Sequence, residues 1–89
     1  MAVRKTFKIT NKQGLHARPA ALFVRTAARY TSEIWVIKED EEVNGKSIMG
    51  LMMLAAEFGS ELEVRAEGAD EAAAIAELDR LISGGFGGL

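Results

Sequence analysis

The chain has 89 residues, with 48% hydrophobic and 27% charged side chains and a formal net charge of -2 at pH 7. This length and composition predict one soluble globular domain and exclude a disordered or fibrous chain. Because the sequence contains no cysteine and one histidine, it excludes disulfides, thiolate chemistry and a multi-histidine metal site within one chain. We therefore expect no bound metal and no cofactor.

The N-terminal residues MAVRKTFKI lack the apolar segment of a secretion signal, and no apolar run is long enough to cross a bilayer. We therefore expect a cytoplasmic protein without membrane insertion.

Charge is distributed unevenly along the chain. No Asp or Glu precedes Glu33, whereas seven basic residues do: Arg4, Lys5, Lys8, Lys12, Arg18, Arg25 and Arg29. If the fold keeps these charges on one face, we expect that face to attract an anion or an acidic partner.

The first half of the chain contains one predicted helix and three predicted strands. Alternating apolar and polar residues predict a strand over residues 3–9, and residues 11–14 have the composition of a turn. Apolar side chains at helical spacing predict an amphipathic helix over residues 17–28. The β-branched and aromatic residues of 33–38 predict a second strand, and the acidic start of 39–43 predicts a turn into a short third strand.

The second half adds a strand and two helices. Ser47 is predicted to cap a helix that runs through Leu54 until Gly59 stops it, and the alternation in residues 61–67 predicts a fourth strand. Asp70 is predicted to cap a third helix, whose apolar stripe consists of Ala74, Ile75, Leu78, Leu81 and Ile82. The glycine-rich residues 84–89 are predicted to form a flexible tail outside a domain of residues 1–83.

These elements follow the order βαββαβα and predict an α+β fold. A four-stranded antiparallel sheet with three helices on one face, an open-faced β-sandwich, is the simplest way to bury the apolar stripes of three helices. The strands have one polar side each, which agrees with a sheet that is covered on one face only.

The run GLHARPAA, residues 14–21, contains the only histidine and the only proline of the chain. We expect His16 at the N-cap of the first helix, where backbone N–H groups lack intrahelical partners and the helix dipole is positive. Pro19 fits the first turn, because its missing N–H is one that the helix does not use. A neutral imidazole can accept a phosphoryl group, which these amides and the Arg18 guanidinium can bind. A purely structural histidine is the alternative that the run alone leaves open.

The run GLHARPAA, followed by GKSIMGLMMLAA and later by AEGADE, resembles the HPr family, the phosphocarriers of the bacterial phosphoenolpyruvate-dependent phosphotransferase system. The similarity extends from Phe7 to Ile82 without insertions. It implies the open-faced β-sandwich fold, and a phosphoryl carrier rather than an enzyme. It further implies that His16 takes a phosphoryl group on Nδ1 from enzyme I and passes it to an EIIA protein or domain. Arg18 corresponds to the active-site arginine, and the phosphate-binding residues would be Ala17, Arg18 and Pro19.

The resemblance also implies a regulatory site and a docking surface. Ser47 corresponds to the serine that HPr kinase/phosphorylase modifies in many bacteria, although a serine there can serve as an N-cap alone. Transcriptional regulators are further candidate partners. In the family, the first two helices form the surface for enzyme I and EIIA, so the expected contacts are Ala17, Ala21, Ile48, Met49 and Met52. Family members usually act as monomers.

Some residues depart from the family pattern. Met53 and Ala55 stand where many regulated members have serine and glycine, and the ending LMMLAA resembles members of the nitrogen-related branch of the system. The sequence therefore leaves open whether the phosphoryl group serves sugar transport or a regulatory phosphorelay.

Two other classes of protein fit the sequence poorly. An acylphosphatase-like enzyme needs a glycine-rich phosphate loop, which is missing. A nucleic-acid-binding sheet needs basic and aromatic residues, whereas Glu61, Glu63 and Glu67 line one strand.

Overall fold

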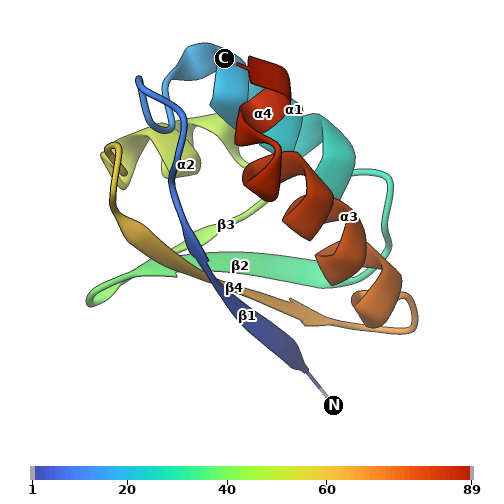
Figure 1. The fold of residues 1–89 in the computed structure, drawn as a ribbon. Helices are drawn as coiled ribbons and strands as arrows, with labels where there is room; N and C mark the ends of the chain where they lie inside the picture. Colours follow the sequence, from blue (N-terminus) through green and yellow to red (C-terminus); the bar gives the residue numbers. More distant parts are fainter. Residues whose placement is uncertain (1, 89) are drawn as a thin grey trace.

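Helices cover one face of a four-stranded sheet in the computed structural model, which describes residues 2–88 (Figure 1). The elements in chain order are β1 (Val3–Lys8), α1 (Ala17–Ala27), β2 (Glu33–Lys38), β3 (Glu41–Asn44), α2 (Ile48–Met53), β4 (Glu61–Glu67), α3 (Glu71–Ser83) and α4 (Gly85–Gly88). The first seven confirm the predicted order βαββαβα and the open-faced β-sandwich. The eighth, α4, was not predicted.

The sheet has the strand order β1-β4-β2-β3, and every neighbouring pair is antiparallel. Residues on β4 alternate as predicted, with Leu62, Val64 and Ala66 buried under the helices. Phe7 pairs with Leu62 across β1 and β4, and Val36 pairs with Val64 across β2 and β4. Register therefore places apolar side chains of three strands on the same face.

Three helices bury apolar side chains against this face of the sheet. The residues are Ala20, Phe23 and Ala27 of α1, Leu51 of α2, and Ala74, Ile75, Leu78 and Ile82 of α3. The sequence predicted that the apolar stripe of α1 consists of Ala20, Ala21, Val24, Ala27 and Ala28. In the structure, Phe23 and Thr26 of α1 are also buried, whereas Ala28 is exposed. The large ring of Phe23 removes more apolar surface from water than an alanine methyl does, so α1 turns that side inward.

The C-terminal segment contradicts the prediction of a flexible tail over residues 84–88. Phe86 is only 2% exposed and belongs to the core, and α4 packs on α3. Gly85, Phe86 and Gly87 all have positive φ, between 55° and 72°, so the backbone is left-handed after Gly84. Glycine adopts such angles at little cost, and burial of the phenyl ring stabilises the turn. Leu89 lies outside the described residues.

The same turn lies beside the loop that follows β1. Gly85 and Gly88 line one shallow hollow together with residues of this loop: Thr10, Asn11, Lys12 and Gln13. The C-terminal end is therefore near α1, whereas the N-terminal end of β1 lies on the opposite side of the molecule (Figure 1).

Among the described residues, no helix is both long enough and apolar enough to span a membrane.

Candidate functional site

His16 occupies the N-cap of α1, as the sequence predicted, and its side chain is exposed. Its backbone is extended, with φ -75° and ψ -175°, and its carbonyl oxygen accepts a hydrogen bond from the Ala20 N–H at 2.9 Å. The imidazole itself makes no capping hydrogen bond. The N–H groups of Ala17 and Arg18 belong to the first turn, where no helix carbonyl can accept them, and Pro19 has no N–H. The ring therefore stands at a helix end with two amides free for an anion.

The loop before His16 is held by one hydrogen bond within the loop and one to the segment after α2. Asn11 is 4% exposed, and its Nδ2 donates to the Gly14 carbonyl at 2.7 Å. Leu15 is buried, and its N–H donates to the Ala56 carbonyl at 2.8 Å. Gly14 has φ +66°, and a Cβ there would lie 2.3 Å from the Ala56 oxygen. Only glycine fits this approach, which fixes the position of His16 relative to residues 55–57.

Two hollows flank His16, and both include Gln13. The first, the arginine hollow, has a volume of about 340 Å³ and is lined by Gln13, His16, Ala17, Arg18 and Pro19. The second, the glutamate hollow, has a volume of about 260 Å³ and is lined by Gln13, Leu15, His16, Met52, Ala55, Ala56 and Glu57. The first hollow thus contains the predicted phosphate-binding residues, and the second connects His16 to α2.

Helix α2 presents apolar side chains to solvent next to α1. Ile48, Met49, Met52 and Met53 are 41%, 72%, 45% and 72% exposed, and Met52 lines the glutamate hollow. Ala17 is exposed, and the half-buried Ala21 lines a further hollow with Arg18 and Arg25. The structure therefore brings Ala17, Ala21 and Met52 close to His16 or Arg18. Ile48 and Met49 are exposed on the same helix as Met52 without lining either hollow.

Ser47 caps α2 as predicted. Its Oγ accepts a hydrogen bond from the Gly50 N–H at 3.0 Å, and the side chain is half-buried. The neighbouring Lys46 extends the other way, where its Nζ donates to the Tyr30 carbonyl at 2.7 Å. Ser47 is therefore at the N-terminus of α2 rather than in the hollows beside His16.

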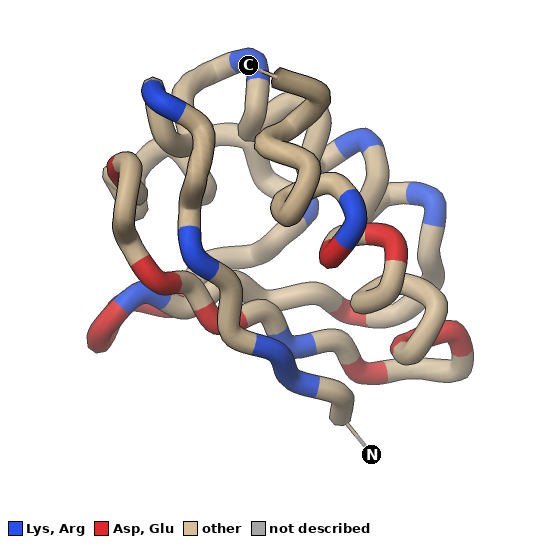
Figure 2. Tube along the Cα trace, in the orientation of Figure 1, with Lys and Arg blue, Asp and Glu red and all other residues tan. Residues whose placement is uncertain are grey.

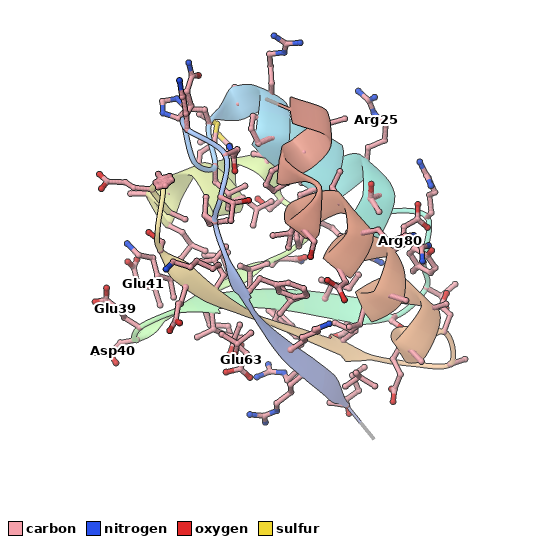
Figure 3. All side chains as sticks on the ribbon, in the orientation of Figure 1. Arg25, Glu39, Asp40, Glu41, Glu63 and Arg80 are labelled. Atoms are coloured by element: carbon pink, nitrogen blue, oxygen red, sulfur yellow. The ribbon has the colours of Figure 1, made fainter. Side chains whose placement is uncertain are left out.

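Basic residues follow α1, the loop before it and β1 (Figure 2). Figure 3 shows Arg25 extending from α1 into solvent, while Glu39, Asp40 and Glu41 lie at the turn between β2 and β3. None of the ion pairs among residues 2–88 uses Arg18, Arg25 or Lys12. These three cations remain available to an anion or an acidic surface. The fold does not keep all seven cations together, because Arg4, Lys5 and Arg29 form ion pairs with carboxylates elsewhere on the molecule.

Two residues of the site were missed from the sequence. Gln13 and Glu57 line the hollows beside His16. Nothing local marks Glu57, because the hydrogen bond from Leu15 to Ala56 brings it to the site from a distant part of the chain. Within the part that the structure describes, no group of His, Cys, Asp and Glu residues could hold a metal ion.

A family model described as the PTS HPr component phosphorylation site matches residues 3–84. The chain belongs to the HPr family. It is 53% identical over 85 residues to the phosphocarrier protein HPr of Neisseria meningitidis, and the alignment covers 96% of both chains. A crystal structure of HPr from Thermoanaerobacter tengcongensis superimposes with a TM-score of 0.93 at 52% identity and covers 96% of each chain.

Membership makes the chain a phosphocarrier of the phosphotransferase system without independent catalysis, and it confirms the resemblance seen in the sequence. The family also contains variant assemblies. A crystal structure of Crh from Bacillus subtilis, with a TM-score of 0.75 at 44% identity over 91% of this chain and 93% of that one, is a dimer with a swapped domain. The expectation of a monomer therefore stays a prediction for this HPr-family chain.

Proposed function

We propose that His16 carries the phosphoryl group in this chain, receiving it on Nδ1 from enzyme I and passing it to an EIIA protein or domain. The observation that supports the proposal is the exposed imidazole at the N-cap of α1, beside Arg18 and two unpaired backbone amides. A purely structural histidine would cap the helix with its side chain or pack in the core, whereas the His16 imidazole makes no capping hydrogen bond and is exposed.

The transfer chemistry needs a nucleophile and a place for negative charge. The lone pair of Nδ1 forms the new N–P bond while the bond between phosphorus and the donor atom breaks, and the electron pair of that bond stays on the donor. The arginine hollow then receives the phosphoryl oxygens through the Ala17 and Arg18 amides and the planar Arg18 guanidinium. The reverse sequence of bond changes delivers the group to the acceptor.

We assign partner docking to Ala17, Ala21, Ile48, Met49 and Met52. Exposed methionines adapt to several surfaces because their side chains are flexible and polarisable. The unpaired cations Arg18 and Arg25 favour an acidic partner surface by electrostatic steering. We expect the carrier to act as a monomer in the cytoplasm, with the apolar side chains of α2 free to meet each partner in turn.

The proposed test combines enzyme I, labelled phosphoenolpyruvate and variants of the chain. The wild type is expected to form an acid-labile, base-stable phosphoprotein, and His16→Ala to form none. Arg18→Ala is expected to be phosphorylated more slowly by at least about tenfold, because charge-assisted hydrogen bonds are lost. Arg80→Ala, which removes an equal charge from the exposed side of α3 and outside the hollows around His16 and Arg18, serves as the matched control. Full labelling of His16→Ala would refute the assignment.

We further propose that Ser47 is a regulatory phosphorylation site. Phosphate on its Oγ would remain next to the amides at the start of α2 and would place negative charge beside Ile48 and Met49. That charge would repel an acidic partner. HPr kinase/phosphorylase with ATP is expected to label wild type and not Ser47→Ala, and an unlabelled wild type beside a labelled HPr control would exclude the site.

The downstream branch is the remaining alternative. A sugar-specific EIIA and a nitrogen-branch EIIA can be supplied together as acceptors to phosphorylated chain. We expect the phosphoryl group to pass faster to the sugar-specific EIIA. Faster transfer to the nitrogen-branch EIIA would instead assign the chain to the regulatory phosphorelay.

A further inference from the structure

Glu57 and the proposed phosphoacceptor line the same hollow. Arg18 does not line this glutamate hollow, but it lines the arginine hollow together with His16. Its backbone is packed against the loop before His16, because a Cβ on Gly14 would lie 2.9 Å from the Glu57 Cα. His16 therefore shares one hollow with a cation and another with a carboxylate.

The position of Glu57 is fixed by its backbone rather than by its carboxylate. Its N–H donates to Ser60 Oγ at 2.9 Å, and its carbonyl accepts from the Ser60 N–H at 2.9 Å. Among the hydrogen bonds and ion pairs of the described residues, none uses the Glu57 carboxylate. A change in this side chain therefore alters the charge of the hollow without removing a bond that holds the fold.

Glu57 is also the only carboxylate among the described residues that line the two hollows. The rest of the glutamate hollow consists of apolar side chains, the amide of Gln13 and His16 itself. No Lys or Arg lines this hollow, but Lys38 contacts one of its lining residues, since its Nζ donates to the Ala55 carbonyl at 3.5 Å. The Coulomb energy between Glu57 and an added phosphoryl group is repulsive, and it is reduced by Lys38, solvent and salt.

We propose that Glu57 sets the phosphoryl-transfer potential of this carrier. Its carboxylate raises the free energy of phosphorylated His16 and directs the phosphoryl oxygens into the arginine hollow. This inference rests on the proposed function, since it assumes that His16 is the acceptor. When the phosphoryl group leaves, the N–P bond breaks with its electron pair on the imidazole, phosphorus bonds to the acceptor, and the repulsion is relieved. The carrier gives up its group more readily because of this carboxylate.

The experiment measures the equilibrium between phosphoenolpyruvate plus free chain and pyruvate plus phosphorylated chain. Enzyme I is present in catalytic amount, and a catalyst leaves an equilibrium constant unchanged. A variant that binds enzyme I more weakly therefore reaches equilibrium more slowly, but its equilibrium ratio of phosphorylated to free protein is unaffected. Isotope-labelled wild type and one unlabelled variant are incubated together in the same solution, which contains a high ratio of pyruvate to phosphoenolpyruvate. Mass spectrometry then gives the phosphorylated fraction of each protein. The variants are Glu57→Gln, Glu57→Asp and, as a matched loss of charge at the far end of β4, Glu67→Gln.

We expect the ratio of phosphorylated to free protein to be about fivefold higher for Glu57→Gln than for wild type at low salt, from repulsion between one charge and a dianion. Glu57→Asp and Glu67→Gln should stay within about twofold of wild type, and about 1 M salt should remove most of the difference. Equal ratios for Glu57→Gln and wild type would overturn the inference, as would an equal shift in Glu67→Gln or a shift that salt leaves unchanged. Absence of phosphate on His16 in the wild type would instead refute the proposed function.

Discussion

At the scale of single residues, Asp70 shows how a capping position can serve a different purpose. It precedes α3 as predicted, but its carboxylate makes no capping hydrogen bond to that helix. Instead Oδ1 accepts from the hydroxyl and the N–H of Ser32, and Oδ2 accepts from the Thr31 N–H at 2.8 Å. These hydrogen bonds, with that of the Ser32 hydroxyl foremost, lower the pKa of Asp70 from 3.8 to about 2. The carboxylate thereby ties the start of β2 to the start of α3.

This lowered pKa predicts a defined dependence of stability on pH. Because the folded pKa is below the unfolded one, the ionised carboxylate stabilises the fold above pH 3.8, and the contribution is lost as the pH falls toward about 2. Asp70→Asn is therefore expected to be less stable than wild type at pH 6, with a difference that narrows through this window. Urea denaturation at several pH values measures it. Asp40→Asn, in the exposed turn after β2, is the control, and a difference for Asp70→Asn that stays constant down to pH 2 would contradict the assignment.

At the scale of elements, the site depends on the contact between the loop before α1 and the segment after α2. Gly14→Ala would introduce a Cβ 2.3 Å from the Ala56 oxygen at a residue with φ +66°. Gly59→Ala is a matched control, because φ there is +89° and no atom lies within 4 Å of the added Cβ. We expect Gly59→Ala to cost about 1–2 kcal/mol from the backbone angle alone, and Gly14→Ala to cost clearly more.

Urea denaturation gives the two stability losses, and phosphorylation by enzyme I reports on the position of His16. Gly14→Ala should slow phosphorylation at temperatures where it remains folded, whereas Gly59→Ala should leave the rate unchanged. Equal losses in the two variants would mean that the close approach of Gly14 to Ala56 contributes nothing.

The same contact explains what the sequence could and could not predict. The strands and helices could be predicted because each has a periodic pattern of apolar residues within its own segment. In β4, for example, Leu62, Val64 and Ala66 alternate with polar residues. His16 followed from its place before a helix. Glu57 could not be foreseen, because a hydrogen bond between residues as distant in sequence as Leu15 and Ala56 leaves no local pattern. The burial of Phe86 was missed because the glycines around it gave the segment the composition of a flexible tail, although Phe86 is a large apolar side chain that can anchor residues 84–88 in the core.

At the scale of the whole molecule, the core includes the last described turn. Phe86→Ala would remove a ring that is 2% exposed, and such deletions cost about 3–5 kcal/mol, a large share of the stability of a small domain. Phe58→Ala, which removes the same ring at 61% exposure, should cost less than about 1 kcal/mol. Thermal and urea denaturation of the two variants measures the difference. If the two variants had the same free energy of unfolding, the turn at Phe86 would not unfold together with the rest of the domain.

The placement of this turn also decides how the protein should be handled in binding measurements. Gly88 shares a hollow with the loop residues just ahead of His16, so an affinity tag or surface linker attached there would emerge within reach of approaching partners. β1 starts at Val3 on the opposite side of the molecule (Figure 1). Immobilisation through that end would leave the methionine-rich helix and the imidazole facing the bulk solution.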